Sequence, residues 1–116
     1  MKVRCLQIAS VAFLLSGCGT LAKKAVLINP GDSKARVLEV MGPPGDRQFK
    51  GHDEAWQYCE TDAGISYDDF RIVWFYDDRV TGLTSYKQSQ FGVCAGFFRS
   101  IRWENAPDHT IEIRDR

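Results

Sequence analysis

The chain has 116 residues, with 15 basic and 15 acidic side chains and a formal net charge of zero at pH 7. This length allows a single domain at most. Charges of both signs are interspersed along the chain, so it lacks the clustered basic surface that a nucleic-acid-binding protein needs. We therefore expect no nucleic-acid partner.

The first residues have the pattern of an export signal rather than of a folded domain. Lys2 and Arg4 give a positive start, and an apolar run at residues 8–15 follows. That run is shorter than the ~20 apolar residues that span a bilayer. A positive segment followed by a short apolar run is typical of a secretory signal.

The tetrapeptide Leu15-Ser16-Gly17-Cys18 ends this segment and resembles a bacterial lipobox. In a lipobox the cysteine thiol is the nucleophile that takes a diacylglyceryl group, and the peptidase cuts before the cysteine. Two or more acyl chains anchor a protein stably. We therefore expect a lipoprotein signal peptide at residues 1–17 and lipid attachment, palmitate included, at Cys18. The alternative is an ordinary signal with a chance cysteine.

Cleavage at this point would leave a tether at residues 18–28 and a domain at residues 29–116. It would remove Lys2 and Arg4, leaving 13 basic and 15 acidic residues and a net charge of about −2. Gly19 follows the lipidated position, where an Asp would favour retention in the inner membrane. The sequence therefore predicts an outer-membrane lipoprotein whose domain faces the periplasm.

Two cysteines remain in the mature chain besides the lipid-attachment site, Cys59 and Cys94. Disulfides persist in the oxidising compartments that receive exported proteins. A bridge between this pair would close a loop of about 36 residues and contribute ~3–4 kcal/mol in the chain-entropy model. We expect this disulfide; the alternatives are two free buried thiols or metal ligands.

One helix has clear signals at both ends. Ser33, or else Asp32, is a favourable N-cap residue, and apolar side chains recur at helical spacing up to Met41. Gly42 and the prolines after it then stop the helix. The sequence predicts a helix from about Ser33 to Met41, followed by a polar, turn-rich loop at residues 45–54.

Three segments downstream have strand character. They are residues 55–61, residues 70–76 and the more polar residues 80–90. Residues 77–79 predict a tight turn between the second and third strands. Residues 70–76 place apolar side chains on both faces of the strand. This pattern favours a central strand that is covered on both sides.

These elements predict an α+β fold in which one or two N-terminal helices pack on a three-stranded antiparallel meander. A C-terminal extension from about residue 91 would add one or two helical turns within residues 94–100 and a possible short strand at residues 110–114. The expected core consists of Val37, Leu38, Met41, Trp56, Tyr58, Ile72, Trp74, Phe97 and Phe98.

Four short segments follow one another in a distinctive order: Asn29-Pro30-Gly31-Asp32-Ser33, Met41-Gly42-Pro43-Pro44, Trp56-Gln57-Tyr58 and Val73-Trp74-Phe75-Tyr76-Asp77. In this order they resemble the SmpA/OmlA family of outer-membrane lipoproteins, the BamE-like proteins. The resemblance covers roughly residues 28–86. It implies helices packed on three strands and a non-enzymatic role in the assembly of outer-membrane proteins. The cysteine pair and the tail from residue 91 depart from the family pattern.

No catalytic motif stands out. His52 beside Asp53 and Glu54 has the residue types of a base with carboxylates, but a solvated polar loop is the simpler interpretation. His52 and His109 with the two cysteines lack the short paired spacings of a zinc site. The acidic loops lack the twelve-residue pattern of a calcium-binding loop. We expect no enzyme activity, no cofactor and no metal.

The aromatic residues point to binding, because aromatic side chains are enriched in binding hot spots. We expect the sheet face opposite the helices to form a partner surface from Tyr58, Val73, Phe75 and Trp103. Alternatively, the C-terminal segment folds back and covers that face.

The sequence thus predicts an anchored scaffold or assembly module that contacts envelope proteins, possible partners being β-barrel assembly subunits or a barrel protein. The alternative is a periplasm-facing inhibitor-like or ligand-binding module that uses its sheet face.

Overall fold

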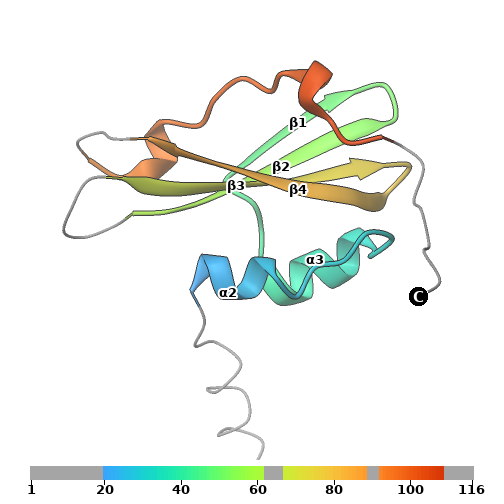
Figure 1. Cartoon of the computed structure of the whole chain (residues 1–116), viewed down its shortest axis with the longest axis horizontal. Helices are drawn as coiled ribbons and strands as arrows, with labels where there is room; N and C mark the ends of the chain where they lie inside the picture. Colours follow the sequence, from blue (N-terminus) through green and yellow to red (C-terminus); the bar gives the residue numbers. More distant parts are fainter. Residues whose placement is uncertain (1–19, 62–66, 89–91, 109–116) are drawn as a thin grey trace, which may run out of the picture.

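The computed structural model describes residues 20–61, 67–88 and 92–108. Two short helices, α2 (Leu21–Ala25) and α3 (Lys34–Met41), precede a single antiparallel sheet (Figure 1). The sheet has four strands in the order in which they occur in the chain. The prediction of a three-stranded meander is therefore wrong by one strand, which lies at the start of the sheet.

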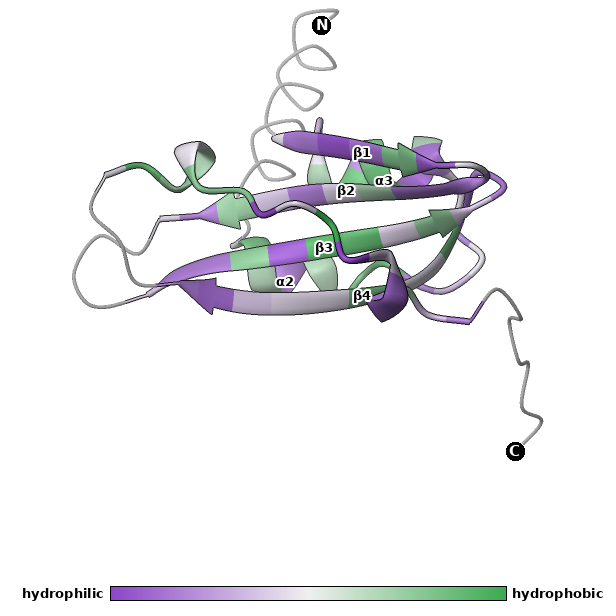
Figure 2. Cartoon of the chain, turned by 90° about the horizontal axis from the view of Figure 1, so that it is seen from above, coloured by the Kyte–Doolittle hydropathy of each residue, from purple (hydrophilic) through white to green (hydrophobic). Residues whose placement is uncertain are grey.

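The additional strand, β1 (Asp46–Lys50), lies within the segment that was expected to be a loop. It pairs with β2 (Asp53–Glu60) from Asp46↔Gln57 to Lys50↔Asp53. It was missed because its sequence, DRQFK, is almost entirely hydrophilic, as Figure 2 shows along β1. An edge strand with largely solvated side chains needs no apolar alternation, so its composition resembles that of a loop.

The third and fourth strands agree more closely with expectation. They are β3 (Asp68–Tyr76) and β4 (Arg79–Gln88), joined by a two-residue turn at Asp77 and Asp78. Both turn residues have positive φ, 46° and 66°. Two successive residues in that region form the primed turn that matches strand twist, which confirms the predicted tight turn.

The predicted helix is confirmed as α3. The hydroxyl of its N-cap residue, Ser33, accepts a hydrogen bond from the Arg36 backbone N–H at 3.1 Å. Gly42 ends the helix with φ of 78° and donates its N–H to the Leu38 carbonyl at 2.9 Å. The shorter α2 falls within the expected tether and is capped by Thr20 in the same way.

The two helices cover one face of the sheet, here called the helix face. Leu38 is 44 % exposed and does not join the core, contrary to expectation. Its place is taken by residues of α2 and of the connection to α3, which the prediction omitted. The buried cluster on this face consists of Leu21, Ala25, Ile28, Val37, Met41, Trp56, Tyr58, Val73, Phe75 and Val80.

Residues 92–108, here called the strap, cross the opposite face of the sheet (Figures 1 and 2). The strap has only two short 3₁₀ turns, Cys94–Gly96 and Trp103–Asn105. It packs on a second buried cluster of Ala55, Ile72 and Trp74. The expected core residue Phe97 is 39 % exposed, and the possible strand at residues 110–114 lies outside the described residues.

Candidate functional site

Three of the four expected partner-surface residues lie under the helices. Tyr58, Val73 and Phe75 are 5 %, 0 % and 1 % exposed. The Tyr58 hydroxyl donates to the Gly42 carbonyl at 2.9 Å, and burial raises the pKa of this phenol. These side chains hold the helices on the sheet, so they form no partner surface. Trp103 lies on the opposite face, apart from the other three.

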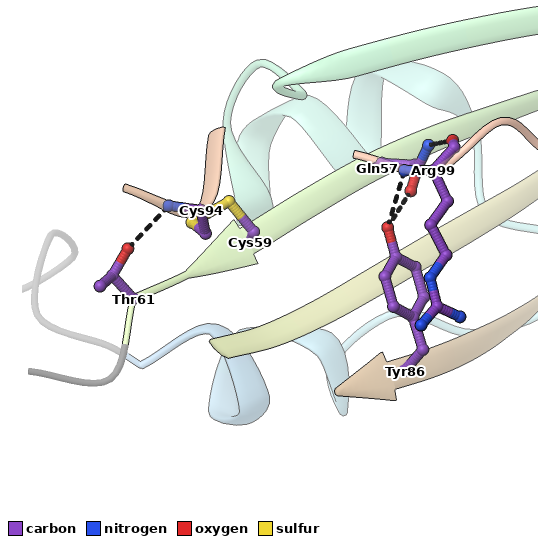
Figure 3. Close-up of a disulfide and its surroundings, with 6 residues drawn as sticks. All are labelled: Gln57, Cys59, Thr61, Tyr86, Cys94 and Arg99. Carbon is purple, nitrogen blue, oxygen red and sulfur yellow. Dashed lines mark hydrogen bonds between the residues drawn. A yellow bond between two sulfur atoms is a disulfide. The ribbon is translucent and has the colours of Figure 1, made fainter. Parts of the chain in front are cut away.

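The strap is fixed at its first turn by a disulfide between Cys59 and Cys94, with a Cα–Cα distance of 6.0 Å (Figure 3). Cys59 belongs to β2, and strand alternation turns its side chain to the strap side of the sheet. The Cys94 N–H also donates to the Thr61 hydroxyl at 3.1 Å. The expected disulfide is confirmed, and the alternatives of free thiols and metal ligands are wrong.

Further along, side-chain amides of the sheet hold the backbone of the strap. Gln57 is fully buried, and its Nε2 donates to the Arg99 carbonyl at 2.7 Å (Figure 3). Its Oε1 accepts from the Tyr86 hydroxyl at 2.6 Å. Gln48 donates to the Arg99 carbonyl at 3.1 Å and accepts from the Ile101 N–H at 2.9 Å. These bonds satisfy buried polar groups and fix the strap in one register.

Two glycines let the strap approach the sheet closely. A Cβ atom on Gly45 would lie 2.6 Å from the Phe98 ring, and one on Gly82 would lie 2.8 Å from Pro107. Phe98 also meets Phe70 edge-on, with ring centroids 5.8 Å apart. Together with the disulfide, these contacts fix the strap near both ends.

An open groove lies at the end of the sheet where the two hairpins turn, and we call it the end groove. It has a volume of about 820 Å³ and is bounded by the β1–β2 turn, Tyr76 and the second half of the strap. Trp103 stands in its wall and meets Trp74 edge-on at 6.1 Å between ring centroids. Its rim carries charges of both signs, among them Lys50, Glu104 and Asp108. A wide, amphipathic groove of this kind suits a protein segment.

His52, the candidate base, also borders the end groove. Its Nδ1 lies 2.8 Å from the Asp77 carboxylate, and both side chains are largely exposed. Glu54, the acid next but one along the chain, faces the helices instead. The structure therefore separates Glu54 from His52, while Asp53 borders the end groove together with His52. This arrangement supports the simpler interpretation of a solvated turn. His109 lies outside the described residues.

An electrostatic cluster surrounds the buried carboxylate of Glu54 on the helix face. Lys34 of α3 lies 2.5 Å from one oxygen, Arg47 of β1 lies 2.9 Å from the other, and the Trp56 indole also donates to it. Burial alone would raise the pKa of Glu54, but the bonds from Lys34, Trp56 and Arg47 outweigh it and lower the pKa. Burial alone would lower the pKa of Lys34, but its hydrogen bonds to Asp78 and Glu54 outweigh burial and raise the pKa.

This cluster predicts an acid-sensitive fold. A carboxyl whose pKa is lower in the folded state stabilises the fold above its unfolded value, near 4.5, and loses that contribution as the pH falls through the folded value. We expect Glu54→Gln to lower the free energy of unfolding by about 1–3 kcal/mol at pH 7. The loss should shrink as the pH falls below the unfolded value. Urea midpoints measured from pH 7 to pH 3 test this, with the exposed Glu39→Gln as control. Parallel curves for Glu54→Gln and the unsubstituted chain would contradict it.

Neither a spanning helix nor a clustered metal site emerges from residues 20–61, 67–88 and 92–108. No helix there is long and apolar enough to cross a membrane, and no three His, Cys, Asp or Glu side chains gather as metal ligands. The expected lipid-attachment residue, Cys18, lies outside the described residues. Comparisons with known protein families, curated proteins and solved structures gave no match. The family resemblance therefore stays a prediction.

Proposed function

We propose that this chain is an outer-membrane lipoprotein, anchored through Cys18, that acts as a non-enzymatic scaffold by binding an envelope protein at the end groove. The anchor rests on the lipobox-like sequence and the positive, apolar segment before it. The confirmed disulfide fits an exported domain, because disulfides persist in oxidising compartments.

The observation that carries the proposed scaffold role is that both faces of the sheet are covered while the end groove stays open. The helices cover one face and the strap covers the other, so the sheet itself can be contacted only at its edges and ends. The end groove combines the aromatic Trp103 and Tyr76 with a charged rim. An aromatic centre surrounded by polar residues is the arrangement of protein-binding hot spots.

The alternative, an inhibitor-like module that uses its sheet face, needs a bare sheet face. Within the described part of the chain, the central strands present none. The resemblance to the SmpA/OmlA family favours β-barrel assembly subunits or a barrel protein as the partner. The strap and its disulfide, which depart from the family pattern, favour a related lipoprotein over the assembly subunit itself.

The test is co-purification from solubilised membranes of cells that make the acylated protein. We expect Trp103→Ala to reduce recovery of an assembly subunit or barrel protein by about tenfold or more. Trp103→Phe, which keeps a ring against Trp74, should retain most of the recovery. Tyr67→Ala removes a more exposed aromatic side chain at the opposite end of the sheet and serves as control. Equal recovery with all three variants would overturn the proposal.

A further inference from the structure

A second, smaller pocket lies between the strap and the outer half of the sheet, and we call it the strap pocket. Its volume is about 270 Å³. Its floor is formed by β3 and β4, including Trp74 and Tyr86, and its roof by residues 99–102 and Asn105 of the strap. The volume is below the usual range for drug-sized ligands, ~300–1,000 Å³, so the pocket suits a molecule built on one ring.

The shape and the apolar lining fit a flat ligand. Trp74 and Tyr86 supply ring surfaces, and Ile72 and Ile101 supply aliphatic surfaces from floor and roof. The Trp74 indole N–H donates to the Thr84 hydroxyl at 2.8 Å. Thr84 therefore has its own hydroxyl hydrogen available to donate to a ligand, since the oxygen is the acceptor in that bond.

The charge in this pocket has one sign. Arg99 and Arg102 line it, and no acidic side chain does. The Arg99 guanidinium lies over the Tyr86 ring at 4.3 Å from its centroid, and its Nε donates to Gln88 at 3.0 Å. Stacking and that hydrogen bond fix the plane of the guanidinium, and a fixed guanidinium fork recognises a carboxylate well. Arg102 is 3.4 Å from Glu104 in an exposed pair, so its charge is partly compensated.

We propose that the strap pocket binds a small aromatic carboxylate, with its ring between Trp74 and Ile101 and its carboxylate on Arg99. The site exists because the strap is held over the sheet, so the Cys59–Cys94 disulfide supports its roof. This site adjoins the end groove, because Ile101 lines both, but the proposal does not depend on the scaffold role.

The test uses the purified full chain in detergent, labelled with ¹⁵N and titrated with benzoate, while the signals of the Trp74 indole and the Arg99 guanidinium are followed. Benzylamine has the same ring with the opposite charge and serves as the matched control. We expect saturable shifts at both groups with benzoate and at least tenfold weaker binding of benzylamine. Shifts that do not saturate, or equal binding of benzylamine, would overturn the proposal.

Substitution of Arg99 and reduction of the disulfide separate the roles of the charge and of the roof. Arg99→Gln keeps the backbone bonds of the strap, so its fold should persist while benzoate binding falls about tenfold. Arg99→Lys should restore part of the affinity. Reduction of the disulfide in the unsubstituted chain should also weaken binding. Unchanged affinity in Arg99→Gln would refute the carboxylate contact, and unchanged affinity after reduction would refute the strap as a wall of the site.

Discussion

Phe75→Ala should lower the free energy of unfolding by about 3–5 kcal/mol. The Phe75 ring is 1 % exposed and packs against Trp56, with ring centroids 4.7 Å apart, between the sheet and α3. Truncation removes the burial of the ring and leaves a cavity under the helix. Since small domains have only about 5–15 kcal/mol of stability in total, the variant should be partly unfolded at 37 °C.

Urea denaturation followed by tryptophan fluorescence measures this loss. Phe49→Ala is the matched control, because Phe49 lies on the same side of the sheet but is 64 % exposed. We expect the control to change stability by less than about 0.5 kcal/mol. A stable Phe75→Ala protein that had lost only partner binding would instead support the surface role that the sequence suggested.

Replacing both Cys59 and Cys94 with alanine should have the second largest effect, a loss of about 3–4 kcal/mol. The pair closes a long loop and fixes the start of the strap, which is otherwise held mainly by side-chain amides and two aromatic contacts. We therefore expect the loss to be concentrated in the strap and the helix face to stay folded.

Hydrogen exchange separates the two regions. The Ile101 amide, which donates to Gln48, should exchange much faster in the double variant, and the Val37 amide of α3 should change little. Addition of a reductant should reproduce the effect in the unsubstituted chain and do nothing further in the variant. Equal protection of Ile101 with and without the disulfide would contradict the assigned role.

Local chemistry made part of this fold predictable. Ser33 and Gly42 bound α3 with a capping hydroxyl and a positive φ, and both act on neighbours in sequence. The two acidic residues at positions 77 and 78 form the turn between the most β-prone segment and the strand after it. The cysteine pair was predictable for another reason, because the signal-like first segment predicted an oxidising compartment, in which disulfides persist.

The side of the sheet that the helices cover could not be predicted in the same way. Val73 and Phe75 on one face are as apolar as Ile72 and Trp74 on the other, so alternation alone does not distinguish the faces. The sequence interpretation placed the helices on the wrong side. That choice made Tyr58, Val73 and Phe75 look like a surface, whereas the strap covers the opposite face.

The groups that position the strap were missed for a related reason. Gln48 and Gln57 resemble ordinary polar residues of a solvated strand, and Gln57 is nevertheless fully buried. Its neighbours in sequence, Trp56 and Tyr58, are apolar, so a lone amide between them was the available signal. The end groove combines residues 50–53 with residues 101–108, and no local pattern joins segments so far apart.

The most direct test of the proposed contact surface is photo-cross-linking in cells that make the acylated protein. Photoreactive residues at Lys50 and at Glu104 sample the two sides of the end-groove rim, and one at Tyr67 samples the opposite end of the sheet. We predict that both rim positions capture the same barrel-assembly or barrel protein and that the Tyr67 position does not. Capture from Tyr67 with silence at both rim positions would contradict the proposal.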